Sequence, residues 1–225
     1  ELARLAGEVA DQYVAENMPA AGRRFAYLVE RLKRGVTRLL AYLQAEQAQS
    51  LFHPAAFEQE IGTGEGAVPP LTLRTPDGRT VQVQGKIDRV DVMEREGRTY
   101  LRVVDYKTGA PKTEFRDLDA LFSADSRQRN AAALQTLLYS MMVSRTTGSD
   151  VQPALYYVRR MNDPDYSPLL VEGKREVFSF APYRDPLQAY LQTTLASLFD
   201  FSEPFRQCDD RSVCEYCDFR EICRR

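Results

Sequence analysis

Two short stretches of the chain, GKIDRVD and VVDYKTG, carry residues whose types and spacing could act on a phosphodiester. Side chains alternate between the two faces of a strand, so Asp105 and Lys107 should point into the same space while Tyr106 points away. The turn expected at 94–97 folds one stretch back beside the other as a hairpin, which brings Asp88 next to them. We therefore expect two carboxylates and a lysine to meet on adjacent strands.

Two carboxylates at one strand pair repel each other unless a cation lies between them, and oxygen ligands suit a hard cation such as Mg2+ or Mn2+. A lysine beside that cation can orient a water molecule and stabilise charge on a phosphate. The competing interpretation is a solvated cross-strand pair of Asp105 and Lys107. The run LRVV before Asp105 is apolar enough for a buried strand, where a charge is costly unless it is paired or used. The pattern favours a metal-dependent phosphodiesterase.

A helix expected at about 128–145 contains Gln135 and Tyr139 within the run AAALQTLLYSMM. Residues four apart share one helical face, so an amide and a phenol would project together beside the two strands. There they could bind a phosphate or orient Lys107. The competing interpretation is a polar helix edge, with Tyr139 packed on the sheet.

The cysteines form a second cluster, because Cys208, Cys214, Cys217 and Cys223 are the only four in the chain and all lie near its C-terminal end. The sequence has no secretory signal and no transmembrane run, so a reducing cytosol and a metal centre are expected in preference to disulfides. Thiolates spaced C-x2-C-x5-C can close around zinc or around an iron–sulfur cluster. The spacing does not separate the two.

Taken in order, these motifs resemble the PD-(D/E)XK nuclease superfamily, in its RecB-like branch, and within it the C-terminal nuclease domain of AddB-type helicase-nuclease subunits. The resemblance is carried by the acid in G-x-I-D-R, by D-Y-K and by Q-x-x-x-Y. The segments that follow the AddB pattern in order are 54–62, 69–73, 76–91, 103–109 and 214–223.

The resemblance implies a DNA exonuclease that depends on Mg2+ or Mn2+. Asp88, Asp105 and the main-chain carbonyl of Tyr106 would hold the metal, and Lys107 would position the attacking water. The helix residues Gln135 and Tyr139 would steady the scissile strand. The implied substrate is single-stranded DNA as it leaves a helicase subunit of the AddA type, in double-strand break repair by recombination in a bacterial cytoplasm, with no membrane involved.

In AddB-like nucleases the motif matched by Cys214, Cys217 and Cys223 holds a 4Fe-4S cluster together with a fourth cysteine far upstream. No cysteine precedes Cys208, and the chain opens at Glu1 without a methionine, so we expect a fragment of a longer protein. Either the upstream ligand is missing and Cys208 is incidental, or Cys208 takes its place. In the first case the fragment would hold the cluster poorly or lack it.

Hydrophobic periodicity predicts the elements that must position these residues. Helices are expected at 1–17, 22–48, 128–145 and 184–200, and strands at 55–62, 70–75, 80–92, 99–107 and 152–160, with a tight hairpin at Asp77-Gly78 and a polar loop at 109–126. The last strand should lie beside the strand that carries Asp105. This order predicts an α/β fold with a restriction-endonuclease-like core, a mixed central sheet flanked by helices. We expect an N-terminal helical segment at 1–50, the nuclease core at 51–203 and a cysteine-rich tail at 204–225.

The chain has 225 residues, of which 44% are hydrophobic and 28% charged, as in ordinary globular domains with a substantial core. A net charge of -2 argues against a generally basic DNA-coating protein. It leaves room for a nuclease, because local basic patches make the phosphate contacts. The candidates for such contacts are Arg127, Arg129 and Lys112, with Arg159 and Arg160 as further members.

Other acids and the single histidine are weaker candidates. Glu58 matches a glutamate of the family and is a further catalytic candidate, against a plain surface role. His53 stands in a proline-containing loop and is interpreted as an ordinary loop residue. RecB-like nucleases often carry an extra metal ligand on an upstream helix, which here would fall to Glu8 or Asp11. The alternative function is a catalytically weak DNA-binding or docking module with a structural zinc or iron–sulfur site.

Overall fold

The computed structural model describes residues 2–18, 22–64, 67–75, 77–125, 127–161, 163–202, 204 and 206–224. Its helices are α1 (Leu2–Asn17), α2 (Gly22–Gln49), α3 (Leu118–Leu121), α4 (Ala131–Thr147) and α5 (Arg184–Leu198), with the 3-10 turns η2 (Ala181–Tyr183) and η3 (Arg211–Tyr216). Its strands are β1 (His53–Ile61), β2 (Leu71–Arg74), β3 (Thr80–Val83), β4 (Gly85–Arg95), β5 (Arg98–Lys107), β6 (Glu114–Phe115), β7 (Asp150–Tyr157), β8 (Val171–Glu172) and β9 (Arg175–Glu176). The helices and main strands predicted from the sequence are confirmed, with boundaries that differ by a few residues.

The main sheet has the strand order β1-β4-β5-β7. Strands β1, β4 and β5 pair antiparallel, whereas β7 pairs parallel to β5 after a crossover through α4. The mixed sheet and the place of β7 beside the strand of Asp105 are therefore confirmed. Between β4 and β5, Glu96 and Gly97 have φ angles of 52° and 70°. Two successive left-handed residues match the twist of a tight hairpin, which fixes the register of the two strands.

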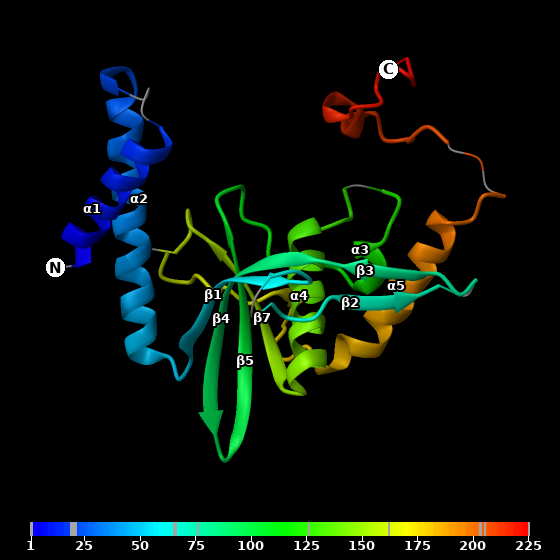
Figure 1. Ribbon diagram of the computed structural model, residues 1–225, viewed down its shortest axis with the longest axis horizontal. Coiled ribbons are helices and arrows are strands. Elements are labelled where there is room, and N and C mark those ends of the chain that lie inside the picture. Colours follow the sequence, from blue (N-terminus) through cyan, green and yellow to red (C-terminus); the bar gives the residue numbers. More distant parts are fainter. Residues whose placement is uncertain are drawn as a thin grey trace.

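The sheet lies between α2 on one face and α4 on the other (Figure 1). On the α4 face, Ile87, Val103 and Leu155 pack with Leu137 and Met141 in one fully buried cluster. This packing holds α4 rigidly across β5 and β7, and it brings the polar residues of the helix to the end of the sheet.

The α2 face has a smaller core. Val104 and Tyr156 are fully buried there and pack with Leu39, Tyr42 and Leu43 of α2. Side-chain alternation along β5 thus sends Val104 towards α2 and its neighbour Val103 towards α4, so the two faces have separate roles.

The start and end of α4 are fixed by its caps. The side chain of Asn130 accepts a hydrogen bond from Ala133 N at 3.1 Å, and Gly148 ends the helix with a φ of 71°. The Asn130 amide also donates to the carbonyls of Lys112 at 2.7 Å and Glu114 at 3.0 Å. The first turn of the helix is therefore anchored to the segment that leaves β5.

Two sequence-based expectations need correction. The strand predicted at 80–92 is two strands, because pairing changes at Gln84. β3 pairs with β2 in a hairpin around Gly78 (φ 86°), while β4 joins the main sheet. The β2–β3 hairpin lies over α4 and reaches towards α5 (Figure 1). The polar loop predicted at 109–126 contains β6 and α3, since β6 pairs with β8 and Asp117 caps α3 by accepting from Ala120 N at 2.8 Å.

After α5 the chain leads into the cysteine-containing segment, which lies away from the sheet (Figure 1). None of the four cysteines forms a disulfide within the described part of the chain, and Cys208 and Cys217 are exposed. Within the described residues, no group of three or more histidine, cysteine or carboxylate side chains lies together in a way that could hold a metal ion. The iron–sulfur site built on Cys214, Cys217 and Cys223 stays a prediction. None of the described helices combines the length and apolar character needed to cross a membrane.

Candidate active site

A chain of polar contacts links the end of β5 to α4. Lys107 Nζ lies 2.6 Å from Asp105 Oδ2 and donates to Gln135 Oε1 at 3.0 Å. The amide of Gln135 donates in turn to the hydroxyl of Tyr139 at 3.1 Å. The structure therefore brings four of the predicted site residues together on the α4 face of the sheet.

Asp88 joins this group from β4. Its Oδ2 accepts a hydrogen bond from Tyr106 N at 2.7 Å. Arg89 of β4 pairs with Val104 of β5, so the residue before Arg89, Asp88, lies next to the residue after Val104, Asp105. Tyr106 itself turns to the α2 face, where its hydroxyl accepts a hydrogen bond from Arg89 at 2.8 Å. Two carboxylates and one ammonium group thus share one end of the β4–β5 pair.

Burial raises the pKa of Asp105, whose side chain is only 4% exposed. The ammonium group of Lys107 lowers this pKa, and the negative charge of Asp88 raises it. A divalent cation would remove the cost of two close carboxylates in this buried setting. Mg2+ is commonly held by one or two carboxylates and keeps several waters, so the oxygen donors present fit such an ion.

The raised pKa of Asp105 gives a stability prediction. Because the pKa lies above its value in the unfolded chain, the stability that protonated Asp105 contributes is complete below the unfolded pKa and is lost as pH rises through the folded pKa. We expect Asp105→Asn to raise the melting temperature of the metal-free protein at pH 8. The gain should shrink as pH falls towards 4.5, and added Mg2+ should stabilise only the wild type. A less stable variant at pH 8 in EDTA would contradict the assignment.

Gly85, the first residue of β4, makes room for Tyr139. A Cβ at Gly85 would lie 3.0 Å from Cε1 and 3.2 Å from the hydroxyl oxygen of Tyr139, closer than ordinary contact. The glycine therefore lets the phenol lie against the strand that carries Asp88, where its hydroxyl meets Gln135.

Replacing Gly85 with alanine should displace the Tyr139 ring and disturb its bond to Gln135. We expect hydrolysis of DNA to fall by about one order of magnitude, the effect typical of a group that positions another. Gly109→Ala is the matched control, because a Cβ there would meet nothing within 4 Å. Initial rates of the two variants measured side by side check this, and equal rates would show that the close approach has no catalytic consequence.

Glu58 lies on β1 in an unusual conformation. It stands between Phe57, which pairs with Arg89, and Gln59, which pairs with Ile87. Its φ of 50° is left-handed, which is strained for a glutamate. The carboxylate is two-thirds exposed and lies 3.0 Å from Lys86 Nζ. The Glu58 side chain thus forms an exposed ion pair, and its part in catalysis stays a prediction.

Three of the predicted DNA-contact residues have partners within the chain. Arg127 forms two hydrogen bonds of 3.0 Å with the carboxylate of Asp125, and Lys112 Nζ donates to the carbonyl of Arg129 at 2.8 Å. Arg160 pairs with Asp163 at 2.6 Å.

The weaker candidates lie elsewhere. Asp11 forms an ion pair with Lys33, and Glu8 pairs with Arg4 at 2.5 Å. His53 is the first residue of β1, at the edge of the main sheet, rather than the loop residue expected from sequence.

A buried ionic cluster on the α2 face was not predicted from the sequence. It consists of Glu46, Arg89, Asp91 and Arg102, whose side chains are at most 17% exposed. Arg89 and Arg102 both bind Asp91, and Arg102 also reaches Glu46 at 2.8 Å. The sequence signal for this cluster was the alternation of charged with apolar residues inside strands that were predicted to be buried.

Comparison with known proteins identifies the family of this chain. The family model of the PD-(D/E)XK nuclease superfamily matches residues 1–224. The chain belongs to this superfamily. The resemblance inferred from the motifs is therefore confirmed, and the mixed central sheet with helices on its faces is consistent with a PD-(D/E)XK fold.

Among curated relatives of this PD-(D/E)XK chain are proteins named as subunits of ATP-dependent helicase/deoxyribonucleases. The one from Clostridium acetobutylicum is 31% identical over 158 residues, which cover 68% of this chain and 12% of the relative. That from Acetivibrio thermocellus is 36% identical over 128 residues, 51% of this chain and 11% of the relative. That from Moorella thermoacetica is 38% identical over 103 residues, 46% of this chain and 9% of the relative. The matched part is about a tenth of each relative's length.

Proposed function

We propose that this chain is a deoxyribonuclease domain that hydrolyses DNA phosphodiesters with the help of Mg2+ or Mn2+. The observation that carries the proposal is the joining of Asp88, Asp105 and Lys107 at one end of the β4–β5 pair, with Lys107 held by Gln135. A buried carboxylate with a raised pKa beside a second acid and a lysine is the combination expected of an active site, and superfamily membership supports it.

The roles of the side chains follow from their positions. Asp88 and Asp105, with the main-chain carbonyl of Tyr106, would hold the divalent cation. When bound, such an ion makes a water easier to ionise and counters charge on the phosphate. Lys107 would orient the water and bind a phosphate oxygen, and it is kept in place by Asp105 and Gln135. The amide of Gln135 and the hydroxyl of Tyr139 would bind the scissile strand.

The wider setting of this proposal comes from the relatives. Their names describe subunits of ATP-dependent helicase/deoxyribonucleases, so we propose that this domain acts as an exonuclease on DNA delivered by a helicase subunit of the AddA type. Processing of broken DNA ends during recombination in the bacterial cytoplasm is the process that such a partnership serves.

Digestion of end-labelled single-stranded DNA tests the proposal. The wild-type protein should degrade it with Mg2+ or Mn2+ and leave it intact in EDTA, whereas Asp105→Ala should not degrade it under any of these conditions. Asp119→Ala is the matched control, because that carboxylate is 76% exposed on α3 and lies outside the polar chain that joins β5 to α4. Equal degradation by wild type and Asp105→Ala would assign the activity to another site or to a contaminant.

A further inference from the structure

A groove of about 520 Å3 lies between α2 and the segment that follows β7. Its α2 wall is formed by Tyr27, Arg31, Arg34 and Arg38, and Arg159 lines it from the other side. All of these side chains are exposed. The groove therefore presents four guanidinium groups and a phenol ring to solvent.

The arginines of this groove are a source of positive charge. Across the residues that the structure describes, none of the four forms an ion pair with a carboxylate, unlike Arg127 or Arg160 elsewhere. The one acid lining the described part of the groove, Glu30, lies 3.5 Å from Lys33 Nζ. On a chain with a net charge of -2, this is a local positive surface.

The spacing along α2 makes the surface continuous. Residues three or four apart share one helical face, so Tyr27, Arg31, Arg34 and Arg38 form a stripe of about 16 Å at 1.5 Å per residue. Arg31 covers the Tyr27 ring with its guanidinium carbon 5.9 Å from the centroid. Gly35 lies within this stripe and leaves open space where a side chain would stand, although glycine weakens a helix interior.

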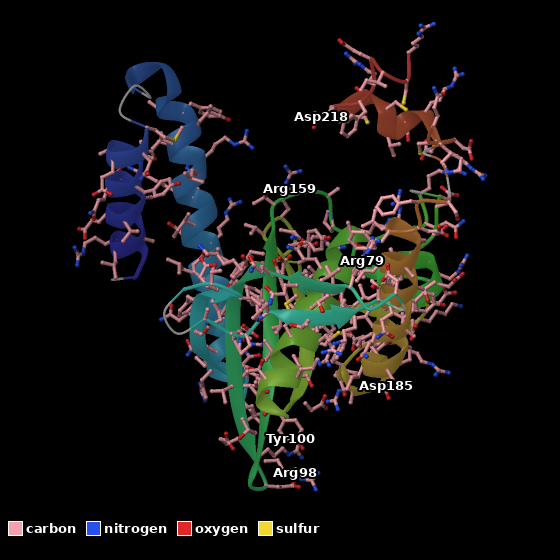
Figure 2. All side chains as sticks on the ribbon, turned by 45° about the vertical axis from the view of Figure 1, so that its right-hand side comes forward. Arg79, Arg98, Tyr100, Arg159, Asp185 and Asp218 are labelled. Carbon is pink, nitrogen blue, oxygen red and sulfur yellow. The ribbon has the colours of Figure 1, made fainter. Side chains whose placement is uncertain are left out.

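The groove opens at the same end of the sheet as the candidate active site. Val158 N donates to the carbonyl of Lys107 at 3.1 Å, and Arg159 is the next residue along the chain. Figure 2 shows Arg159 at this end, with Arg98 and Tyr100 at the opposite, hairpin end of the sheet. A ligand in the groove would therefore lie close to the main chain of Lys107, and it would reach the Lys107 side chain on the α4 face by passing round this end of the sheet.

We infer that the groove of Tyr27, Arg31, Arg34, Arg38 and Arg159 binds single-stranded DNA and leads it to the candidate active site. A positive track combined with an exposed aromatic ring is the combination that binds single strands, because phosphates meet the cations and an unpaired base stacks on the ring. In a duplex the bases are stacked on each other and could not use the phenol. That the DNA is led to the candidate active site rests on the proposed deoxyribonuclease function, whereas the binding of DNA in the groove does not.

A fluorescence experiment tests the stacking. The chain contains no tryptophan, so Tyr27→Trp creates a single reporter in the groove, and Tyr100→Trp creates a matched reporter at the hairpin end. Titration with an oligothymidylate in EDTA, where cleavage cannot occur, should quench the first reporter and leave the second unchanged. Equal quenching at both positions, quenching at neither, or stronger quenching by duplex DNA would overturn the inference.

A salt titration tests the arginines. In EDTA, Arg34→Gln with Arg159→Gln should weaken oligothymidylate binding about tenfold at low salt, and should lower the slope of log affinity against log salt by about 1.4, or 0.7 for each lost phosphate contact. Arg98→Gln with Arg145→Gln removes the same charge away from the groove and should change neither quantity. Identical slopes for the two double variants would overturn the inference. Because no cleavage is measured, this result is separable from failure of the proposed nuclease.

Discussion

Replacing Lys107 with alanine is expected to lower the rate of DNA hydrolysis by about 10²–10³-fold, the loss usual for a group that stabilises developing charge. The ammonium group lies 2.6 Å from Asp105 and 3.0 Å from the oxygen of Gln135, so its position is fixed by both strand and helix. Alanine leaves neither a charge for the phosphate nor a donor for the water. Initial rates on end-labelled single-stranded DNA at saturating Mg2+ measure the effect.

A second readout separates a catalytic role from a structural one. Lys107 lowers the pKa of Asp105, so its removal should raise that pKa further and move the acid limb of the pH–rate profile to higher pH. Lys174→Ala is the control, because that exposed lysine lies in the turn between β8 and β9, outside the polar chain that joins β5 to α4. The assignment fails if Lys107→Ala keeps more than half of the wild-type rate and Lys174→Ala behaves in the same way.

The local arrangement of this site was predictable because it depends on short-range rules. Alternation along one strand places Asp105 and Lys107 on one face, and a tight turn at 94–97 brings β4 back beside it. The four-residue spacing of Gln135 and Tyr139 likewise follows from the helix period. Each of these relations joins residues that lie within one secondary-structure element or within one hairpin.

Relations between distant elements could not be predicted in the same way. Nothing in the run 80–92 shows that pairing changes at Gln84, because β-rich residues continue on both sides of it. The groove beside Arg159 needs α2 and the end of β7 to be neighbours, and no local pattern encodes that contact.

The buried ionic cluster on the α2 face explains why charged residues interrupt the two strands that carry the site acids. Arg89 follows Asp88 directly, and its guanidinium group binds both Asp91 and the hydroxyl of Tyr106, which follows Asp105. The main chain that carries Asp88 and Asp105 is therefore held by contacts on the α2 face, opposite to the candidate active site. We expect this cluster to position the strands rather than to add stability over an apolar core, because desolvation offsets much of its attraction.

Helix α2 is tied to this arrangement through Glu46. Its Oε1 accepts from Tyr156 at 2.7 Å and lies 2.8 Å from a guanidinium nitrogen of Arg102. Arg102 in turn binds Asp91 at 2.7 Å. The helix that carries the arginine groove and the strands that carry the site acids therefore share one ionic cluster. Loss of its central carboxylate, that of Asp91, should destabilise the packing of both the helix and the strands.

Asp91→Ala should lower the free energy of unfolding by about 3–5 kcal/mol, because it leaves the buried cations Arg89 and Arg102 without their shared carboxylate. For a chain of this size that corresponds to a fall of about 6–20 °C in melting temperature. Glu96→Ala is the control, since its pair with Arg95 is exposed at 3.6 Å and should contribute at most about 1 kcal/mol. Urea unfolding of both variants measures the difference. A loss of less than about 1 kcal/mol for Asp91→Ala would mean that α2 and the strands of the site are held together by apolar packing alone.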